Sequence, residues 1–189
     1  MRVLKIGFRI MARANLIDVA KSLMSLARSG WMLRGVSGVV AETVAEHCFL
    51  SAYICLDVGS RIEGIDIGRL TLYALIHDIG ETFVGDIVKA VSSLVGEVKE
   101  EIEFSFVDKH IDNPIVKRLF RGYLEQKDTE SRLARLCNYI ATYIMGLEYK
   151  RLGYRVDDIV DNTYREIRDM AKKLGVENIV DETLNSYRG

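Results

Sequence analysis

The sequence has 189 residues, and proline, cysteine, histidine and tryptophan are all scarce in it. Pro114 is its only proline, and it shows neither a Gly/Ser-rich linker nor an internal repeat. The cysteines, Cys48, Cys55 and Cys137, have no CxxC spacing, which excludes a zinc ribbon and a disulfide framework. We therefore expect one domain over residues 1–189 in the reducing cytoplasm, with a core at about 15–155 and C-terminal helices at 157–186.

Neither positive nor negative charge is in large excess, because the formal net charge is −1 at pH 7. No lysine- or arginine-rich block occurs, which argues against a nucleic-acid partner held by phosphate contacts. No uncharged apolar run approaches the length of a membrane span, so we expect no membrane partner. Arg9 and Arg13 interrupt the apolar N-terminal run and no small-residue cleavage site follows, so we do not expect a signal peptide. Gln126 is the only glutamine, which is typical of heat-adapted proteins.

Apolar residues recur with a helical period, whereas alternating strand-like runs are hard to find. The pattern predicts an all-α fold, a compact helical bundle, with helices at 15–28, 43–59, 66–79, 97–111, 114–125, 129–152, 157–174 and 177–186. The segments 29–42 and 80–96 are expected to be loops. Three helices are expected to start at the N-caps Asp66, Asn113 and Asp157, and two helices are expected to end at Gly153 and Gly175.

The helix expected at 97–111 is rich in charge, and its acids alternate with Lys99. This pattern is typical of a helix face exposed to solvent, and the acids are Glu97, Glu100, Glu101 and Glu103. His110 lies on the same charged helix, and we expect it to be exposed.

Two histidines lie on apolar helix stripes and should point inward. His47 shares a stripe with Thr43, Leu50, Ser51 and Ile54, and His77 shares one with Leu70 and Ala74. Asp78 follows His77 at the expected helix end, where both side chains can reach one point. Asn138 lies among small apolar residues of the helix at 129–152. Each residue alone is more often a hydrogen-bonded core residue, but two imidazoles and a carboxylate together suit a divalent cation.

Several motifs form a set that resembles a known family. They are "ARSGWMLRGV" at 27–36, "ETVAEH" at 42–47, "HDIGE" at 77–81, "GDI" at 85–87 and "NYIATYIMGLEY" at 138–149. The set is similar to the HD-domain superfamily of metal-dependent phosphohydrolases, and more narrowly to its small branch of 5'-deoxynucleotidases. The resemblance covers residues 15–155 and implies a helical HD-domain bundle.

The resemblance implies a metal site at His47, His77 and Asp78, with one divalent ion, which can be Mn, Co, Zn, Ni, Fe or Mg. Glu81 would then orient the attacking water, and Asp86 would assist proton transfer to the leaving oxygen.

The resemblance also implies a substrate site. Arg28 would hold the phosphate of a nucleoside monophosphate, and Trp31 would pack near the sugar. Without the family, we would interpret Arg28 as part of a surface ion pair and Trp31 as a core aromatic residue.

Asn138 departs from the family pattern, because the fourth metal ligand there is an aspartate. An amide oxygen can bind a metal but adds no negative charge. Two functions stay open. The first is a phosphohydrolase that removes the 5'-phosphate from (deoxy)nucleoside monophosphates, and the second is a non-catalytic nucleotide-binding or regulatory module. The few histidines exclude dinuclear relatives, and the resemblance implies a homodimer.

Overall fold

The structure is a computed structural model that describes residues 13–88 and 97–188. In these two ranges the regular elements are helices, joined by turns and two isolated β-bridges. The predicted all-α fold is thus confirmed. The expectation about a signal peptide and the end of the 80–96 loop concern residues 1–12 and 89–96, which lie outside the described residues.

All the helices expected from the sequence are present, with ends that differ by a few residues. They are α1 (Leu16–Ser25), α3 (Val44–Gly59), α4 (Ile67–Ile76), α7 (Glu97–His110), α8 (Pro114–Glu125), α9 (Thr129–Arg151), α10 (Asp157–Leu174) and α11 (Glu177–Arg188). Two short helices, α2 (Ser29–Met32) and α5 (Glu81–Val84), lie where we expected loops. The expectation was wrong there because four residues are too few to show a helical period.

The expected helix caps are mostly confirmed. The side chains of Asp66 and Asn113 accept hydrogen bonds from the first turns of α4 and α8. Gly175 ends α10 with φ +69°, and Gly153 follows α9 with φ +90°. Asp157 is not an N-cap: Val156 occupies that position without a side-chain hydrogen bond, and Asp157 is the first residue of the helix.

The expected solvent-facing surface of α7 needs a correction at two residues. Glu103 is only 4% exposed, and Lys99 Nζ lies 2.8 Å from its Oε1. His110 is 5% exposed and packs against the rings of Phe83 and Phe106. Because α7 packs against α5 and α8, one side of its charged surface is turned inward. The ion pair between Lys99 and Glu103 offsets part of the free-energy cost of burying the Glu103 carboxylate.

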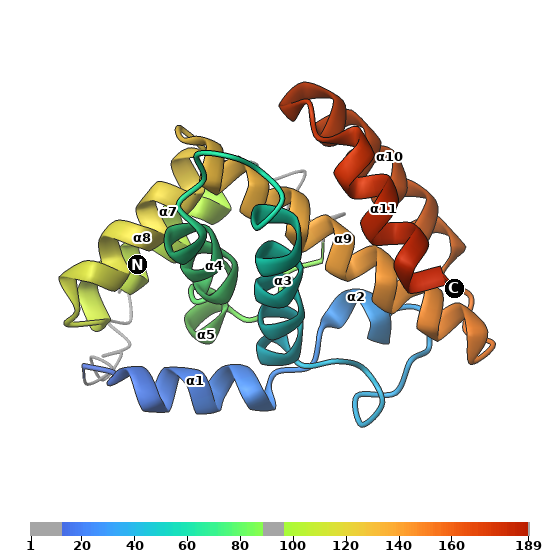
Figure 1. Cartoon of the computed structure of the whole chain (residues 1–189). Helices are drawn as coiled ribbons and strands as arrows, with labels where there is room; N and C mark the ends of the chain where they lie inside the picture. The colour runs from blue at the N-terminus through green and yellow to red at the C-terminus, as the bar shows by residue number, and fades with distance from the viewer. Residues whose placement is uncertain (1–12, 89–96, 189) are drawn as a thin grey trace.

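The helices α3, α4 and α9 pack against one another at the centre of the molecule, and α9 is the longest helix (Figure 1). The last two helices, α10 and α11, form a pair that covers α9 and α3 (Figure 1). Val160, Ile167 and Leu184 of this pair are buried in the same apolar cluster as the centre of α9. The apolar faces of α10 and α11 are therefore used within the chain.

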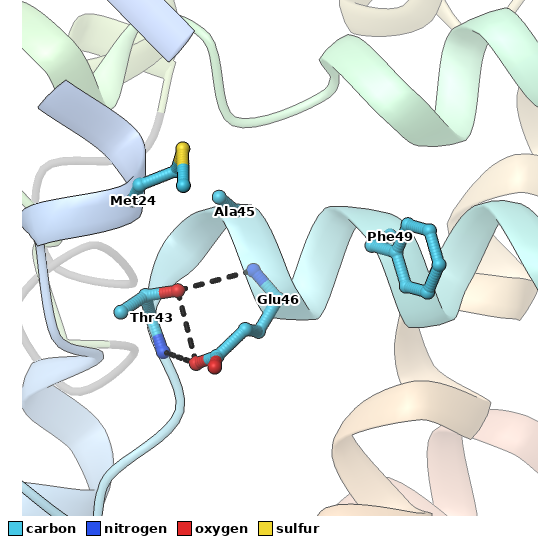
Figure 2. A pocket seen from close by; sticks show the side chains of 5 residues that line it. All are labelled: Met24, Thr43, Ala45, Glu46 and Phe49. Atoms are coloured by element: carbon cyan, nitrogen blue, oxygen red, sulfur yellow. Dashed lines mark hydrogen bonds between the residues drawn. The ribbon is translucent and has the colours of Figure 1, made fainter. Parts of the chain in front are cut away.

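A capping box fixes the start of α3, four residues before His47 (Figure 2). The Thr43 N–H donates to Glu46 Oε2 at 2.6 Å, and the Glu46 N–H donates to Thr43 Oγ1 at 3.2 Å. Met24 and Phe49 flank this box at the surface, as Figure 2 shows. The two reciprocal bonds set the first turn of the helix and so the direction in which His47 points.

Within the ranges that the structure describes, no helix is both long enough and apolar enough to cross a membrane. The single domain stays a prediction. Limited proteolysis tests it, because one domain should resist cleavage between α9 and α10 as well as it does elsewhere.

Candidate metal centre

His47 points inward from α3, as the sequence predicts, and its ring is fully buried. Its Nε2 lies 2.9 Å from Oδ1 of Asn138, which comes from α9. The amide nitrogen of Asn138 donates to Tyr123 Oη at 3.4 Å. Asn138 therefore faces His47 with its oxygen, the atom that a metal ligand would use.

His77 and Asp78 follow directly after the last residue of α4. His77 Nδ1 lies 2.7 Å from the carbonyl oxygen of Ala74, which can only accept a hydrogen bond, so Nδ1 carries a proton. The other ring nitrogen, Nε2, is buried without a hydrogen-bond partner and lies 3.1 Å from Asp78 Oδ2. A lone pair on Nε2 would face a carboxylate oxygen at that distance, which is unfavourable unless a proton or a cation lies between them.

These residues fit a divalent cation. His47, His77 and Asp78 each offer one ligand atom, and the three atoms lie within 4.8 Å of one another. Ligand atoms at right angles around a cation at about 2.1 Å are about 3 Å apart. The His47–Asn138 and His77–Asp78 pairs have this spacing. Nitrogen and oxygen donors of this kind suit Zn, Mn, Co, Fe or Ni.

The electrostatics of the three residues are consistent with such a site. Burial lowers the pKa of His47 well below its usual value, and the Arg28 guanidinium lowers it further, so the ring is neutral. Burial alone would lower the pKa of His77, but the Asp78 carboxylate raises it well above the usual value. The pKa of Asp78 is held well below its usual range by His77, although burial opposes this. A cation would therefore compete with one proton on His77.

A cavity of about 780 Å³ opens beside Asp78 and Asn138, whereas His47 and His77 are not among the residues that line it. The predicted site residues that line it are Arg28, Trp31, Asp78, Glu81, Asp86 and Asn138. The opposite wall comes from α10, through Ile159, Asn162 and Arg165. The cavity thus begins at the predicted metal ligands and extends to a helix that the sequence placed outside the site.

Glu81 is the first residue of α5 and is 6% exposed. Lys99 Nζ lies 3.7 Å from its Oε1, while Oε2 is buried without a hydrogen-bond partner. Burial and the charges of Asp78 and Asp86 raise the pKa of Glu81 to about 9. Gly80 lets α7 come this close, because a Cβ there would lie 2.6 Å from Glu103 Cβ. Glu81 is therefore an acid–base group with a strongly perturbed pKa beside the cavity.

Asp86 is tethered to the start of α2. Its Oδ2 accepts hydrogen bonds from the Ser29 N–H at 2.5 Å and the Ser29 hydroxyl at 2.9 Å. Gly85, at φ +80°, makes the turn that brings Asp86 there. Because Arg28 directly precedes Ser29, this tether brings Asp86 and Arg28 to the same wall of the cavity.

Trp31 is 2% exposed and lies mainly in the core. Its Nε1–H donates to Glu42 Oε1 at 2.8 Å, and its ring packs against Tyr149 with 5.0 Å between centroids. Only part of its ring lines the cavity. Contact with a sugar stays a prediction for Trp31.

Sequence reasoning missed Glu42, Ser29 and Lys99, all of which contact predicted site residues. Glu42 could have been noticed in the sequence, because it is an acid placed between an apolar run at 39–41 and the N-cap of a helix. Lys99 gave no separate signal, because its charge belongs to the pattern of a solvent-facing helix.

Comparison with known proteins gives a family match that includes these residues. Residues 20–175 match the family model described as HD domain. The chain is 26% identical over 152 residues to 5'-deoxynucleotidase HDDC2 of Dictyostelium discoideum. The aligned region covers 74% of this chain and 78% of the relative. It is 25% identical over 150 residues to the human protein of that name, covering 75% and 71% of the two chains.

Solved structures with the same fold support the match. The crystal structure of the PH0347 protein from Pyrococcus horikoshii OT3 aligns with a TM-score of 0.74 and 27% identity, over 90% of this chain and 95% of the other. An HD-domain phosphohydrolase from Listeria innocua aligns with a TM-score of 0.71 over 92% and 90% of the two chains; at 17% identity this shows the shared fold alone. The residues that match the family model make up most of the chain and include His47, His77, Asp78 and Asn138. The chain therefore belongs to the HD-domain family.

Proposed function

We propose that this chain is a metal-dependent phosphohydrolase that removes the 5'-phosphate from (deoxy)nucleoside monophosphates. The observation that carries the proposal is the meeting of ligand atoms of His47, His77 and Asp78 within 4.8 Å, with Asp78 lining a cavity of about 780 Å³. The relatives named 5'-deoxynucleotidase support the substrate class. A cavity of this volume lies within the range of small-ligand sites.

His47, His77, Asp78 and the Asn138 oxygen would hold the metal. When bound, a divalent ion stabilises negative charge on the phosphoryl oxygens and lowers the pKa of water next to it. The charged fork of Arg28 lies at the cavity wall, 3.5 Å from the Thr142 hydroxyl, and there it would bind the phosphate oxygens.

The two acids beside the cavity would move the protons. The pKa of Glu81 would fall beside a bound dication, and the ionised carboxylate would then orient the attacking water and accept its proton while the new P–O bond forms. The P–O5' bond breaks, and Asp86 would help deliver a proton to the departing O5'. Ser29 binds Oδ2 of Asp86 and thereby fixes this carboxyl group beside Arg28, where the phosphate would lie.

The alternative is a non-catalytic nucleotide-binding or regulatory module. The neutral Asn138 favours it, because its oxygen already faces His47 Nε2 at 2.9 Å and brings no charge to a dication. The presence of Glu81 and Asp86 at the same cavity favours the enzyme, since binding alone does not need two acid–base groups.

One experiment separates the two functions. Purified protein is loaded with Mn²⁺, Co²⁺, Zn²⁺, Ni²⁺, Fe²⁺ or Mg²⁺, and phosphate release is measured from a panel of ribo- and deoxynucleoside 5'-monophosphates. We expect release with at least one metal, and loss of both bound metal and activity in His77→Ala and Asp78→Ala. Nucleotide binding without release under every metal would support the non-catalytic module. A variant that keeps metal at full stoichiometry would show that the metal site is misplaced.

The homodimer also stays a proposal. Light scattering of the purified protein tests it, because a mass of about twice the 21.4 kDa of one chain is expected.

A further inference from the structure

Glu42 is a buried acid to which the proposed mechanism gives no role. It directly precedes the capping box of α3 and is only 6% exposed. A single oxygen, Oε1, faces three of the predicted site residues. It accepts the Trp31 Nε1–H at 2.8 Å, and it lies 3.7 Å from Arg28 Nη1 and 3.8 Å from His47 Nδ1. One carboxylate thus connects the predicted metal, phosphate and sugar contacts.

The backbone around Glu42 is fixed on both sides. The Arg28 N–H donates to the Glu42 carbonyl oxygen at 3.0 Å, so the two residues lie on paired segments. The Glu42 N–H donates to the Tyr149 hydroxyl at 2.7 Å, and this hydroxyl donates to the Val40 carbonyl oxygen at 3.2 Å. Glu42 therefore has a fixed position between the Arg28 segment and α9, as a positioning residue requires.

The His47 ring has two neutral tautomers, and they differ in their ability to bind a metal. With the proton on Nε2, the ring would donate to Asn138 Oδ1 and leave Nδ1 as a lone pair facing the Glu42 carboxylate. With the proton on Nδ1, the N–H faces the carboxylate oxygen 3.8 Å away, and the Nε2 lone pair points toward Asn138. Carboxylates that face the outer nitrogen of a ligating histidine favour the second tautomer.

We propose that Glu42 is a positioning residue that holds His47 in the metal-binding tautomer and holds Arg28 at the cavity wall. The first half depends only on a metal site at His47. The second half rests on the proposed function, because it assumes that Arg28 binds phosphate. The negative charge of Glu42 is essential for both halves, whereas the hydrogen bond from Trp31 needs only an oxygen.

The test uses a substitution that removes the negative charge of Glu42 but keeps an oxygen at the same place. Glu42→Gln keeps an oxygen for Trp31 Nε1 and removes the charge that faces His47 and Arg28. Glu130→Gln is a matched control, because Glu130 is also 6% exposed and is paired with a cation, Arg69, at 2.8 Å. Glu130 lies eight residues before Asn138 on α9, which places it about 12 Å away along the helix.

Three measurements are made on the full chain. Calorimetric titration with Mn²⁺ gives the metal Kd, which should rise about 10–100-fold in Glu42→Gln and stay within twofold of wild type in Glu130→Gln. Long-range ¹H–¹⁵N spectra of the metal-free proteins should show a larger fraction of His47 with the proton on Nδ1 in wild type than in Glu42→Gln, although the Asn138 oxygen favours the proton on Nε2 in both. The Kd for inorganic phosphate at saturating Mn²⁺ should rise several-fold in Glu42→Gln alone.

The outcome that overturns the proposal is an unchanged Mn²⁺ Kd and His47 tautomer in Glu42→Gln with the same loss of thermal stability as the control. Glu42 would then be only the structural partner of Trp31. If Glu42→Gln does not fold, Glu42→Asp replaces it; this variant retracts the charge from His47 and should raise the Mn²⁺ Kd several-fold, and an unchanged value overturns the proposal. A wild-type protein that releases no phosphate but shows the expected Mn²⁺ changes would refute the proposed function and leave the role toward His47 intact.

Discussion

The Asn138→Asp substitution tests whether Asn138 belongs to a metal site. Asparagine and aspartate have nearly the same shape, so the change adds a charge with little change in packing. The Asn138 oxygen lies 2.9 Å from His47 Nε2, and the amide nitrogen donates to Tyr123 at 3.4 Å. The variant loses this weak bond and places a second carboxylate near Asp78.

Without metal, the added charge should destabilise the protein. Two like charges about 4 Å apart repel by about 4 kcal/mol at an effective dielectric constant of about 20, and by less when they lie further apart. Arg28 and a protonated His77 offset part of this, so we expect a loss of about 1–3 kcal/mol. For a chain of this length, about 1 kcal/mol shifts Tm by roughly 2–4 °C. The metal-free variant should therefore melt about 2–12 °C below wild type.

With metal, the sign should reverse. The new carboxylate adds the charge that a dication lacks beside the neutral Asn138, and we expect the metal Kd to fall at least about tenfold, which is about 1.4 kcal/mol. Thermal melts with and without Mn²⁺ and a direct Mn²⁺ titration measure both effects. A variant that is destabilised equally with and without metal, and that binds Mn²⁺ no better than wild type, would show that Asn138 is a structural amide rather than a ligand.

Two further predictions concern the cavity, and a third concerns the packing of α9 against α10. Glu81→Gln should keep its metal and lose about 10²–10⁴-fold in turnover. The pKa of Glu81 is about 9 in the folded protein, which is above its value in the unfolded chain. The metal-free wild type should therefore lose stability relative to this variant as pH rises from about 5 to 9. Ser29→Ala should lower kcat with little change in metal Kd, since it frees the Asp86 side chain from one hydrogen bond; an unchanged kcat would show that the tether is irrelevant. Gly146→Ala should lower Tm by several degrees, because its Cβ would lie 2.7 Å from Val160 Cγ2, and a Gly146→Ala/Val160→Ala double variant that recovers no stability would contradict this explanation.

The sequence predicted the helices and the central polar residues well, for a simple physical reason. Long amphipathic helices have a period that identifies the buried face, and this period placed His47 and His77 inside. The same reasoning could not find α2 or α5, because four residues show no period. These two short helices nevertheless position Ser29 and Glu81, so the part of the site that the sequence described least is the part that holds the acids.

The second failure concerns charged residues on helices. Glu103 and Lys99 have the spacing of a solvent-facing ion pair, yet Glu103 is buried and Lys99 lies near both Glu103 and the buried Glu81. A helical pattern shows which residues share a face but not which neighbour covers that face. His110 illustrates the same point, since it lies under Phe83 on a helix that is charged overall. Tertiary packing, not local pattern, decided these positions.

Asn138 and Glu42 lie on opposite sides of the His47 ring, and only Glu42 is an acid. Asn138 faces Nε2 of His47 and is neutral, whereas Glu42 faces Nδ1 and is an acid. The negative charge that is missing from the fourth predicted ligand is therefore present one residue further from the metal, where it acts through the imidazole. This arrangement predicts that the two positions are coupled.

The double variant Asn138→Asp/Glu42→Gln tests this coupling. It moves one negative charge from the outer to the inner side of His47 and leaves the net charge of the cluster unchanged. Glu42→Gln alone should weaken Mn²⁺ binding about 10–100-fold. In that background Asn138→Asp should lower the Mn²⁺ Kd by a larger factor than it does beside Glu42, because the carboxylate of Glu42 then no longer faces His47. The double variant should also regain part of the metal-free stability that Asn138→Asp loses, because one buried carboxylate fewer repels the new one. A double-mutant cycle with Mn²⁺ Kd as the readout is decisive. If the gain from Asn138→Asp is the same with Glu42 and with Gln at position 42, the two residues act independently and Glu42 does not reach the metal through His47.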